Sequence, residues 1–321
     1  MTAHPETTSP PRNTEAGRDR PSRAAKPRNQ RVRRLSAADR VVVGLMVGIP
    51  TLVVLVLVWF PAVATVLLSF TDWNGIGAVS DIHVIGATNY VNVATNYPPF
   101  WPALQHNLIW LGVLFVVATP AGMFLAVLLD KQIKGSRFYQ TALYLPVVLS
   151  LALVGFIWQL IYSRDQGLLN AVLGTQVDWY GDPRYNLWAA LVATCWKHIG
   201  YVMLLYLAGL KAVDASLREA AAIDGANERQ AFFRIVFPVM RPINVIVLVI
   251  TVIEALRAFD LVWIINKGRN GLEVIAALVT ANVVGEASRI GFGSAMATIM
   301  LIISSIFVAV YVTIVIRERQ P

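Results

Sequence analysis

Five ionisable side chains interrupt the long apolar stretches of this 321-residue chain, and they are the residues best able to carry a proton or contact a polar solute. They are Lys197, His198, Glu254, Arg257 and Asp260. An ionised side chain at the centre of a bilayer costs about 2.5–3.5 kcal/mol on insertion scales. We therefore expect these groups to face protein or a water-filled path, and not lipid.

The four ions of this set cancel in charge, and their spacing indicates a polar seam. Lys197 and Glu254 each lie about eleven residues from the expected outer ends of their segments, or roughly 16 Å at 1.5 Å per residue. Glu254, Arg257 and Asp260 are spaced by three, which would place neighbours on one helix face. We expect this seam to border a translocation path. Two alternatives stay open: a buried ion-pair set that only fixes helix packing, and a proton relay through His198 and Glu254.

Residue patterns for catalysis are missing from the sequence. No Gly-x-x-x-x-Gly-Lys-Ser/Thr motif, which would hold ATP phosphates, occurs anywhere. The histidines at positions 4, 83, 106 and 198 have no metal-ligand spacing. The single cysteine, Cys195, excludes an internal disulfide. We expect no enzyme activity, metal site or cofactor site in this chain, so any ATP and Mg²⁺ would be bound by a different polypeptide.

The apolar stretches that carry these charges predict an all-α integral membrane protein. Apolar residues make up 56% of the sequence and charged residues only 14%, against about a quarter in soluble domains. Six segments are long enough to cross roughly 30 Å of hydrocarbon, which takes about 20 residues. They are approximately residues 44–70, 107–129, 139–163, 186–210, 243–265 and 291–316. The apolar stretch 272–284 is short for a span, and we expect a helix that lies along or dips into the outer surface.

Positive charge sets the expected orientation of the spans, because lysine and arginine near span ends stay on the cytoplasmic side. Twenty Lys and Arg residues fall on one side, in residues 1–40, 130–138 and 211–242 and from Arg317 onward. Five fall in the loops on the opposite side. Both termini and residues 211–242 are therefore expected to be cytoplasmic.

The first 40 residues are expected to form a disordered basic tail, ahead of a six-span domain over residues 41–316 and a short tail over 317–321. Ten basic residues, abundant proline and no apolar period are typical of a disordered segment that contacts anionic lipid. Nucleic-acid binding is disfavoured because this tail has no aromatic side chains to stack on bases. A signal peptide cleaved near Ala64 is the rival interpretation of the first span. Its apolar run is too long for that, so we expect an uncleaved anchor.

Residues 211–242 are a polar island between two spans and predict a helix-turn-helix finger. Ser216 and Glu219 have capping-box spacing, so the first helix is expected to begin at Ser216. Gly225 can take the left-handed conformation that closes a helix. A charged segment of this kind must meet something in water, and a partner protein is the expected occupant.

The second helix of the finger has its own start and stop signals. Asn227 and Gln230 repeat the capping pattern, and apolar residues follow at helical spacing. Pro238 and Pro242 are expected to end this helix before the fifth span begins.

The finger resembles the EAA loop of permease subunits of bacterial ATP-binding-cassette (ABC) importers. That loop has Glu-Ala-Ala, then Asp-Gly-Ala, then Ile and Pro roughly ten to thirteen residues after the glycine. The matching residues are Glu219, Ala220, Ala221, Asp224, Gly225, Ala226, Ile235 and Pro238. In that family the loop forms the coupling helices that sit in a cleft of the ATPase subunit, so the resemblance implies a docking role for these positions.

Shorter motifs are similar to the carbohydrate-uptake branch of these permeases, the maltose-transporter type. They are Ser69–Asn74, Asn89–Tyr90, Phe100–Trp101 with Asn107, Leu145–Pro146, Gly167–Asn170 and Phe259–Asp260. Two places depart from the pattern of many relatives. Val213–Asp214 stands where they have Ile-Pro, and residues 267–271 replace a Thr-Gly-Gly-Pro-like turn.

The resemblance implies a type I importer permease fold in a bacterial inner or plasma membrane. It implies pairing with a second permease, two ATPase subunits inside and an extracytoplasmic solute-binding protein. The implied activity is ATP-driven import of a sugar, oligosaccharide or related polyol, with finger motion around Gly225 passed to the fourth and fifth spans. Open alternatives are a non-sugar solute such as glycerol phosphate, a proton-coupled secondary carrier and a membrane-anchored scaffold.

Overall fold

The computed structural model describes residues 36–131, 134–285 and 288–317. The chain divides into two compact units, Met1–Leu55 and Val56–Pro321, which are taken separately below. The predicted basic tail falls mainly in residues 1–35, and most of the predicted C-terminal tail in 318–321, outside the described residues.

The described part of the first unit is the helix α1 (Ala37–Val54), whose hydrophobic side chains are exposed along its length. Ser36 and Asp39 form the capping box that starts it. The expectation of disorder up to residue 40 is therefore wrong for residues 37–40, because a complete cap fixes the helix start there.

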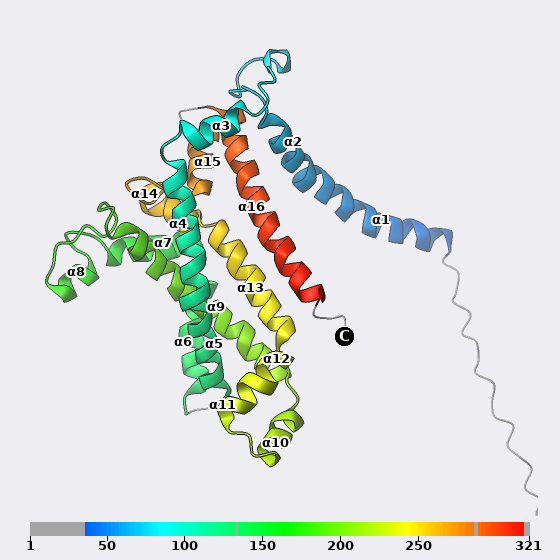
Figure 1. The fold of residues 1–321 in the computed structure, drawn as a ribbon, viewed down its shortest axis with the longest axis vertical. Coiled ribbons are helices and arrows are strands. Elements are labelled where there is room, and N and C mark those ends of the chain that lie inside the picture. Colours follow the sequence, from blue (N-terminus) through cyan, green and yellow to red (C-terminus); the bar gives the residue numbers. More distant parts are fainter. Residues whose placement is uncertain (1–35, 132–133, 286–287, 318–321) are drawn as a thin grey trace, which may run out of the picture. The chain divides into compact units, whose positions relative to one another are not determined.

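The second unit is a helical bundle (Figure 1). Before the finger its helices are α2 (Phe60–Leu68), α3 (Thr88–Thr95), α4 (Phe100–Val113), α5 (Thr119–Asp130), α6 (Ser136–Val148), α7 (Leu151–Ile161), α8 (Leu168–Leu173) and α9 (Asn186–Ala212). From the finger onward they are α10 (Ala215–Ile223), α11 (Glu228–Ala231), α12 (Phe237–Val239), α13 (Arg241–Leu256), α14 (Asp260–Asn266), α15 (Ile275–Val283) and α16 (Ile290–Arg317). The π-helical turns η3 (Leu114–Ala118) and η4 (Phe232–Val236) join α4 to α5 and α11 to α12.

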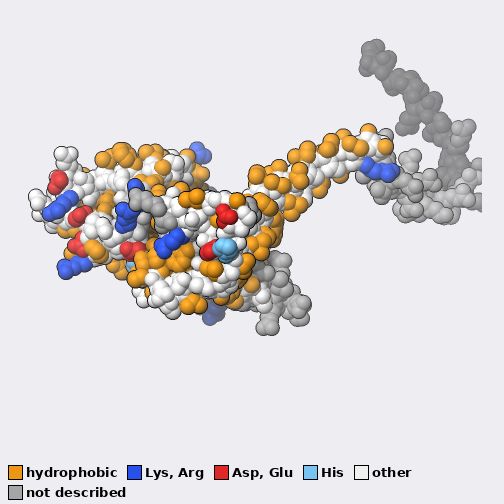
Figure 2. Space-filling model, turned by 90° about the horizontal axis from the view of Figure 1, so that it is seen from above, with side chains coloured by type: hydrophobic (Ala, Val, Ile, Leu, Met, Phe, Trp, Pro, Cys, Tyr) orange, Lys and Arg blue, Asp and Glu red, His pale blue; other side chains and the backbone are white. Residues whose placement is uncertain are grey.

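The finger and α3 lie at opposite ends of this unit (Figure 1). We call them the finger end and the α3 end. Seen from the α3 end, hydrophobic side chains cover the flanks and charged side chains form small separate groups (Figure 2). Such a surface suits burial of the flanks in lipid.

Helices that satisfy the length and apolarity of a membrane span are Ala37–Leu68, Phe100–Asp130, Asn186–Ala212 and Ile290–Val310. They correspond to the first, second, fourth and sixth predicted spans. The third predicted span, 139–163, is two helices, because α6 and α7 are bent by 102° at their junction. Ser150 caps α7 by accepting the Leu153 backbone N–H at 3.3 Å, so its start is locally specified.

The fifth predicted span, 243–265, is also wrong as one helix. α13 ends at Leu256 and α14 begins at Asp260. The physical reason lies in another helix: the side-chain amide of Asn107 in α4, only 1% exposed, donates to the Ala255 carbonyl at 3.2 Å. A carbonyl freed at the helix end is thus satisfied inside the protein, as an interruption at membrane depth requires.

The core joins α9 to its neighbours through small residues. A Cβ on Gly122 of α5 would come within 2.8 Å of Val202, and one on Gly200 would collide with the Leu143 carbonyl of α6. Glycine at these positions lets the helix backbones approach closely, as at many membrane helix interfaces. The predicted helix within 272–284 is confirmed as α15, which packs on α16 and α4.

Candidate functional site

The first helix of the finger begins earlier than the capping pattern predicted. Its N-cap is Asp214, whose carboxylate accepts the Ser216 backbone N–H at 2.9 Å. This hydrogen bond lowers the pKa of Asp214, so the cap is ionised at neutral pH. The predicted Ser216–Glu219 box is wrong, because a carboxylate two residues upstream is an equally good cap and also suits the helix dipole. Glu219 is left exposed.

The turn of the finger is confirmed at Gly225, which has a φ of +79°. The Ala226 N–H donates to the Ala221 carbonyl at 2.9 Å and the Gly225 N–H to the Ala222 carbonyl at 3.1 Å. These two bonds make a Schellman motif, which satisfies the last carbonyls of α10. The second start signal is also confirmed, because Asn227 caps α11 in the predicted box.

The residues that match the EAA pattern present a mostly exposed surface. Glu219, Ala220, Asp224, Gly225 and Pro238 are exposed, Ala226 and Ile235 are half-buried, and Ala221 is buried. Beside them Ile223 is 86% exposed at the end of α10, and Phe233 is 60% exposed. Sequence reasoning gave these two no docking role. Apolar side chains exposed on a polar projection are typical of a protein-binding surface.

A carboxylate at the end of α5 attaches the finger to the bundle. Asp130, with a side chain only 10% exposed, accepts Lys211 Nζ at 2.9 Å and Arg218 Nη1 at 2.8 Å. Arg218 lies in α10, and its Nη2 also donates to the carbonyl of Leu210 near the end of α9, at 3.3 Å. We call Asp130, Lys211 and Arg218 the clamp. It ties the ends of α5 and α9 to the middle of α10, and sequence reasoning missed it.

The next residue attaches the other finger helix. Lys131 Nζ lies 2.6 Å from Glu228 Oε2 in α11, and this bond lowers the pKa of Glu228. The two side chains are 52% and 84% exposed, so the pair contributes little to stability. Consecutive residues of opposite charge at the end of α5 therefore contact both helices of the finger.

The same long helix, Phe100–Asp130, reaches the break between α13 and α14 at its other end. Besides its bond to Ala255, Asn107 accepts the Ile275 backbone N–H at 3.0 Å through its Oδ1. One side chain thus fixes the end of α13 and the start of α15. The clamp and Asn107 lie 23 positions apart on this segment, or roughly 35 Å at helical rise.

Two of the predicted membrane charges meet in one cavity of about 390 Å³, formed by α6, α7, α9, α13 and the start of α14. Lys197 and Glu254 both line it. The Lys197 ammonium donates to the Leu149 carbonyl at 2.9 Å, at the bend between α6 and α7. His198 also lines the cavity and is buried, with Nε2 placed 3.1 Å from Thr251 Oγ1.

The other two charges do not follow the predicted helix face. Arg257 lies just beyond the end of α13, with its guanidinium 4.0 Å from Asp260 at the start of α14. Their side chains are 71% and 40% exposed, and Glu254 is exposed as well. Within this single chain these three side chains are not buried, and the alternative of a buried ion-pair set stays a hypothesis. The charges border a cavity and a helix break.

A family model matches almost all of this architecture. The model for the binding-protein-dependent transport system inner membrane component matches residues 23–320. The chain belongs to this family. This inner membrane component is accordingly a multi-pass membrane protein.

Curated relatives and a solved structure agree with this membership. The chain is 32% identical over 267 residues to the xylose/arabinose import permease protein of Haloferax volcanii, covering 80% of this chain and 82% of the relative. It is 30% identical over 272 residues to a probable starch degradation products transport system permease protein of Thermoanaerobacterium thermosulfurigenes, covering 82% and 91%. A bacterial alginate ABC transporter, solved with an alginate pentasaccharide-bound periplasmic protein, has a TM-score of 0.74 at 20% identity, covering 88% of this chain and 96% of that chain. The fold is therefore that of an ABC importer permease.

Proposed function

We propose that this inner membrane component is one transmembrane half of an ATP-driven importer for a sugar, oligosaccharide or related polyol. The observation that carries the proposal is the finger: an exposed tip at Ile223–Gly225, held to the bundle by the clamp. The printed names of the sugar and oligosaccharide permeases among its relatives support the solute class.

The proposed partners follow from the assignment of this chain as an importer permease. A second, similar permease completes the membrane path, two ATPase subunits bind the fingers, and an extracytoplasmic solute-binding protein delivers the solute. ATP and Mg²⁺ are bound by the ATPases, and this chain has no enzyme activity of its own. The finger end and both termini are cytoplasmic, as the distribution of lysine and arginine predicts.

The contacts suggest how the finger drives the path. Closure of the ATPases displaces α10 and α11, and the clamp passes this displacement to α5. The segment Phe100–Asp130 carries it to Asn107, which holds the break beside the cavity. Because Lys197, Glu254, Arg257 and Asp260 border that cavity and break, we assign them to the translocation path.

The proposed function is tested with the complete complex. The chain is co-expressed and purified with its partners, the binding protein is screened for ligands by thermal shift, and uptake of the best ligand is measured in proteoliposomes. Vanadate is expected to abolish uptake, and a protonophore to leave it unchanged. Protonophore-sensitive accumulation by this chain alone would show a secondary carrier instead. A best ligand such as glycerol phosphate would refute the sugar assignment only.

The path assignment makes a prediction for the charged pair in the cavity. Lys197→Glu alone is expected to lower uptake at least tenfold, because it removes the ammonium that the Leu149 carbonyl accepts and leaves two carboxylates in one cavity. Lys197→Glu combined with Glu254→Lys is expected to restore assembly in the membrane but not uptake. Assembly is measured by co-purification of the ATPase. Recovery of both properties would indicate a purely structural pair.

A further inference from the structure

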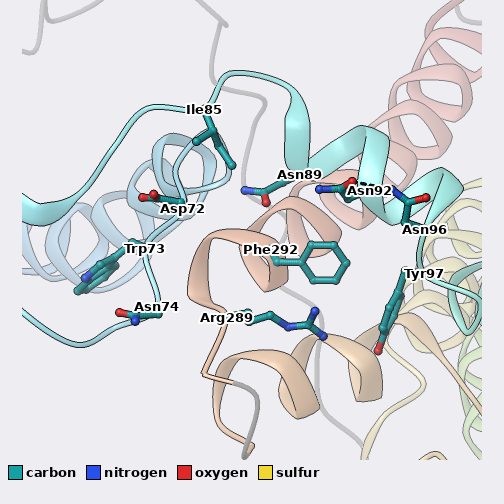
Figure 3. Close-up of a pocket in the computed structure, with 10 residues that line it drawn as sticks. All are labelled: Asp72, Trp73, Asn74, Ile85, Asn89, Asn92, Asn96, Tyr97, Arg289 and Phe292. Carbon is teal, nitrogen blue, oxygen red and sulfur yellow. Dashed lines mark hydrogen bonds between the residues drawn. The ribbon is translucent and has the colours of Figure 1, made fainter.

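A second cavity, of about 320 Å³, lies at the α3 end, far along the chain from the finger (Figure 3). Its wall comes from three segments: the loop that follows α2, the helix α3 with Tyr97 beyond it, and the start of α16. A pocket of this volume falls within the range of about 300–1,000 Å³ that small-molecule sites occupy.

The wall contributed by α3 is a row of amides. The buried Asn89 donates to the carbonyls of Ser69 at 2.9 Å and Thr71 at 2.8 Å, which fixes the loop after α2 against α3. Asn92 and Asn96 follow on the same helix face, and Asn96 Nδ2 donates to Asn92 Oδ1 at 2.9 Å. This bond orients both amides, so that the Asn92 NH₂ donor and the Asn96 carbonyl acceptor are turned to other partners.

The opposite wall is an arginine held between aromatic rings. The Arg289 guanidinium carbon lies 4.8 Å from the ring centroid of Phe292 and 6.0 Å from that of Tyr97. Its Nη2 donates to Asn282 Oδ1 at 2.7 Å, and Tyr97 packs edge-on against Phe292. These contacts orient the guanidinium while using one of its five N–H donors. The guanidinium is therefore already oriented before any ligand binds.

The balance of groups in this cavity identifies a ligand class. Its charged side chains are one anion, Asp72, and one cation, Arg289, so it has no net charge to favour a phosphate or carboxylate. The side-chain amides of Asn92 and Asn96 supply donors and acceptors, and Trp73 supplies an aromatic side chain. We propose that this cavity binds a neutral polyhydroxylated ring, with hydroxyls on Asn92, Asn96 and Arg289. The choice of a sugar rests on the proposed function, to which the cavity adds a reception site separate from the Lys197 cavity.

The test measures binding to the purified full chain in phospholipid nanodiscs by saturation-transfer NMR, with maltose, xylose and arabinose as probes. At least one neutral sugar is expected to bind saturably. Asn92→Ala and Arg289→Ala are each expected to weaken that binding about tenfold or more, as loss of one or two well-placed hydrogen bonds would. Arg164→Ala, which removes an exposed arginine outside both cavities, is the matched control and should leave it unchanged. Lys197→Met tests separately for binding in the other cavity.

Several results would overturn the proposal. One is that no neutral sugar binds saturably, and another is that the Asn92 and Arg289 variants bind as tightly as the original chain. Loss of binding in Lys197→Met only, or displacement of the sugar by sodium sulfate, would equally contradict it. Elution of each variant as a single species in size-exclusion chromatography shows that it is folded. If Arg289→Ala is not folded, Arg289→Lys takes its place in the binding test. Uptake by the complete complex is measured separately. Intact uptake without binding at this cavity refutes the reception site alone, whereas binding without ATP-driven uptake refutes the importer.

Discussion

Replacing Gly225 with proline is expected to abolish uptake while the protein still reaches the membrane. Gly225 has a φ of +79°, whereas proline is fixed near −65°. Proline also removes the N–H that the Ala222 carbonyl accepts, so the Schellman motif cannot form. Without that turn, the relative orientation of α10 and α11 changes, and Ile223 and Asp224 at the finger tip change position. Uptake by the complex and co-purification of the ATPase are the measurements.

Gly225→Asn is the matched control for this change. A Cβ at position 225 would have no atom within 4 Å, and asparagine is the residue after glycine that best tolerates the left-handed conformation. Uptake by this variant is expected to stay within about twofold of the original chain, since its backbone can keep the turn at a cost of order 1 kcal/mol. Normal uptake by the proline variant would mean that the shape of the finger tip does not matter for coupling. Equal loss in both variants would point to the missing glycine rather than to the turn.

The features of the finger that could be predicted from sequence are those that a few adjacent residues determine by themselves. Asn227 and Gln230 form a capping box in which each side chain accepts the backbone N–H of the other. Gly225 adopts a positive φ that most other residues avoid. Such signals survive in any tertiary setting. The one local error, at Ser216, arose because two caps compete within three positions and Asp214 takes the free amide.

The breaks in the third and fifth predicted spans could not be seen in a hydropathy profile. The end of α13 depends on the amide of Asn107, which is 148 residues away in sequence from its acceptor Ala255. The bend between α6 and α7 places the Leu149 carbonyl against Lys197, from a different span. A run of apolar residues has the same hydropathy whether or not a distant side chain satisfies a carbonyl within it.

The clamp escaped prediction for the same reason. Asp130 and Lys131 come at the end of a span, where charged residues are ordinary and indicate only the membrane boundary. Their partners lie far along the chain, and Arg218 is 88 residues from Asp130. Only the packing of α5 on α9 brings the three side chains together.

Neutralising this buried carboxylate by Asp130→Asn is expected to uncouple ATP hydrolysis from uptake. The asparagine cannot hold two cations, so Lys211 and Arg218 lose hydrogen bonds to a charged group, each worth about 1.5–3 kcal/mol before solvent screening. Both cations are partly exposed, which lowers that cost toward 1 kcal/mol and leaves the protein folded. The finger then remains able to bind an ATPase but moves without α5. We expect the ratio of solute moved to ATP hydrolysed to fall at least tenfold in proteoliposomes.

The neighbouring ion pair supplies the control, since Glu228→Gln removes an equally short contact between α5 and the finger in an exposed setting. That variant is expected to keep the transport ratio within about twofold, because exposed pairs are worth roughly 0–1 kcal/mol. A double-mutant cycle separates the clamp from general destabilisation: Arg218→Ala should add little once Asp130→Asn is present. Two results would contradict this role of α5: independent reductions of the transport ratio by the two changes, or normal transport by Asp130→Asn. The finger motion would then have to reach the membrane path through its covalent links to α9 and α13.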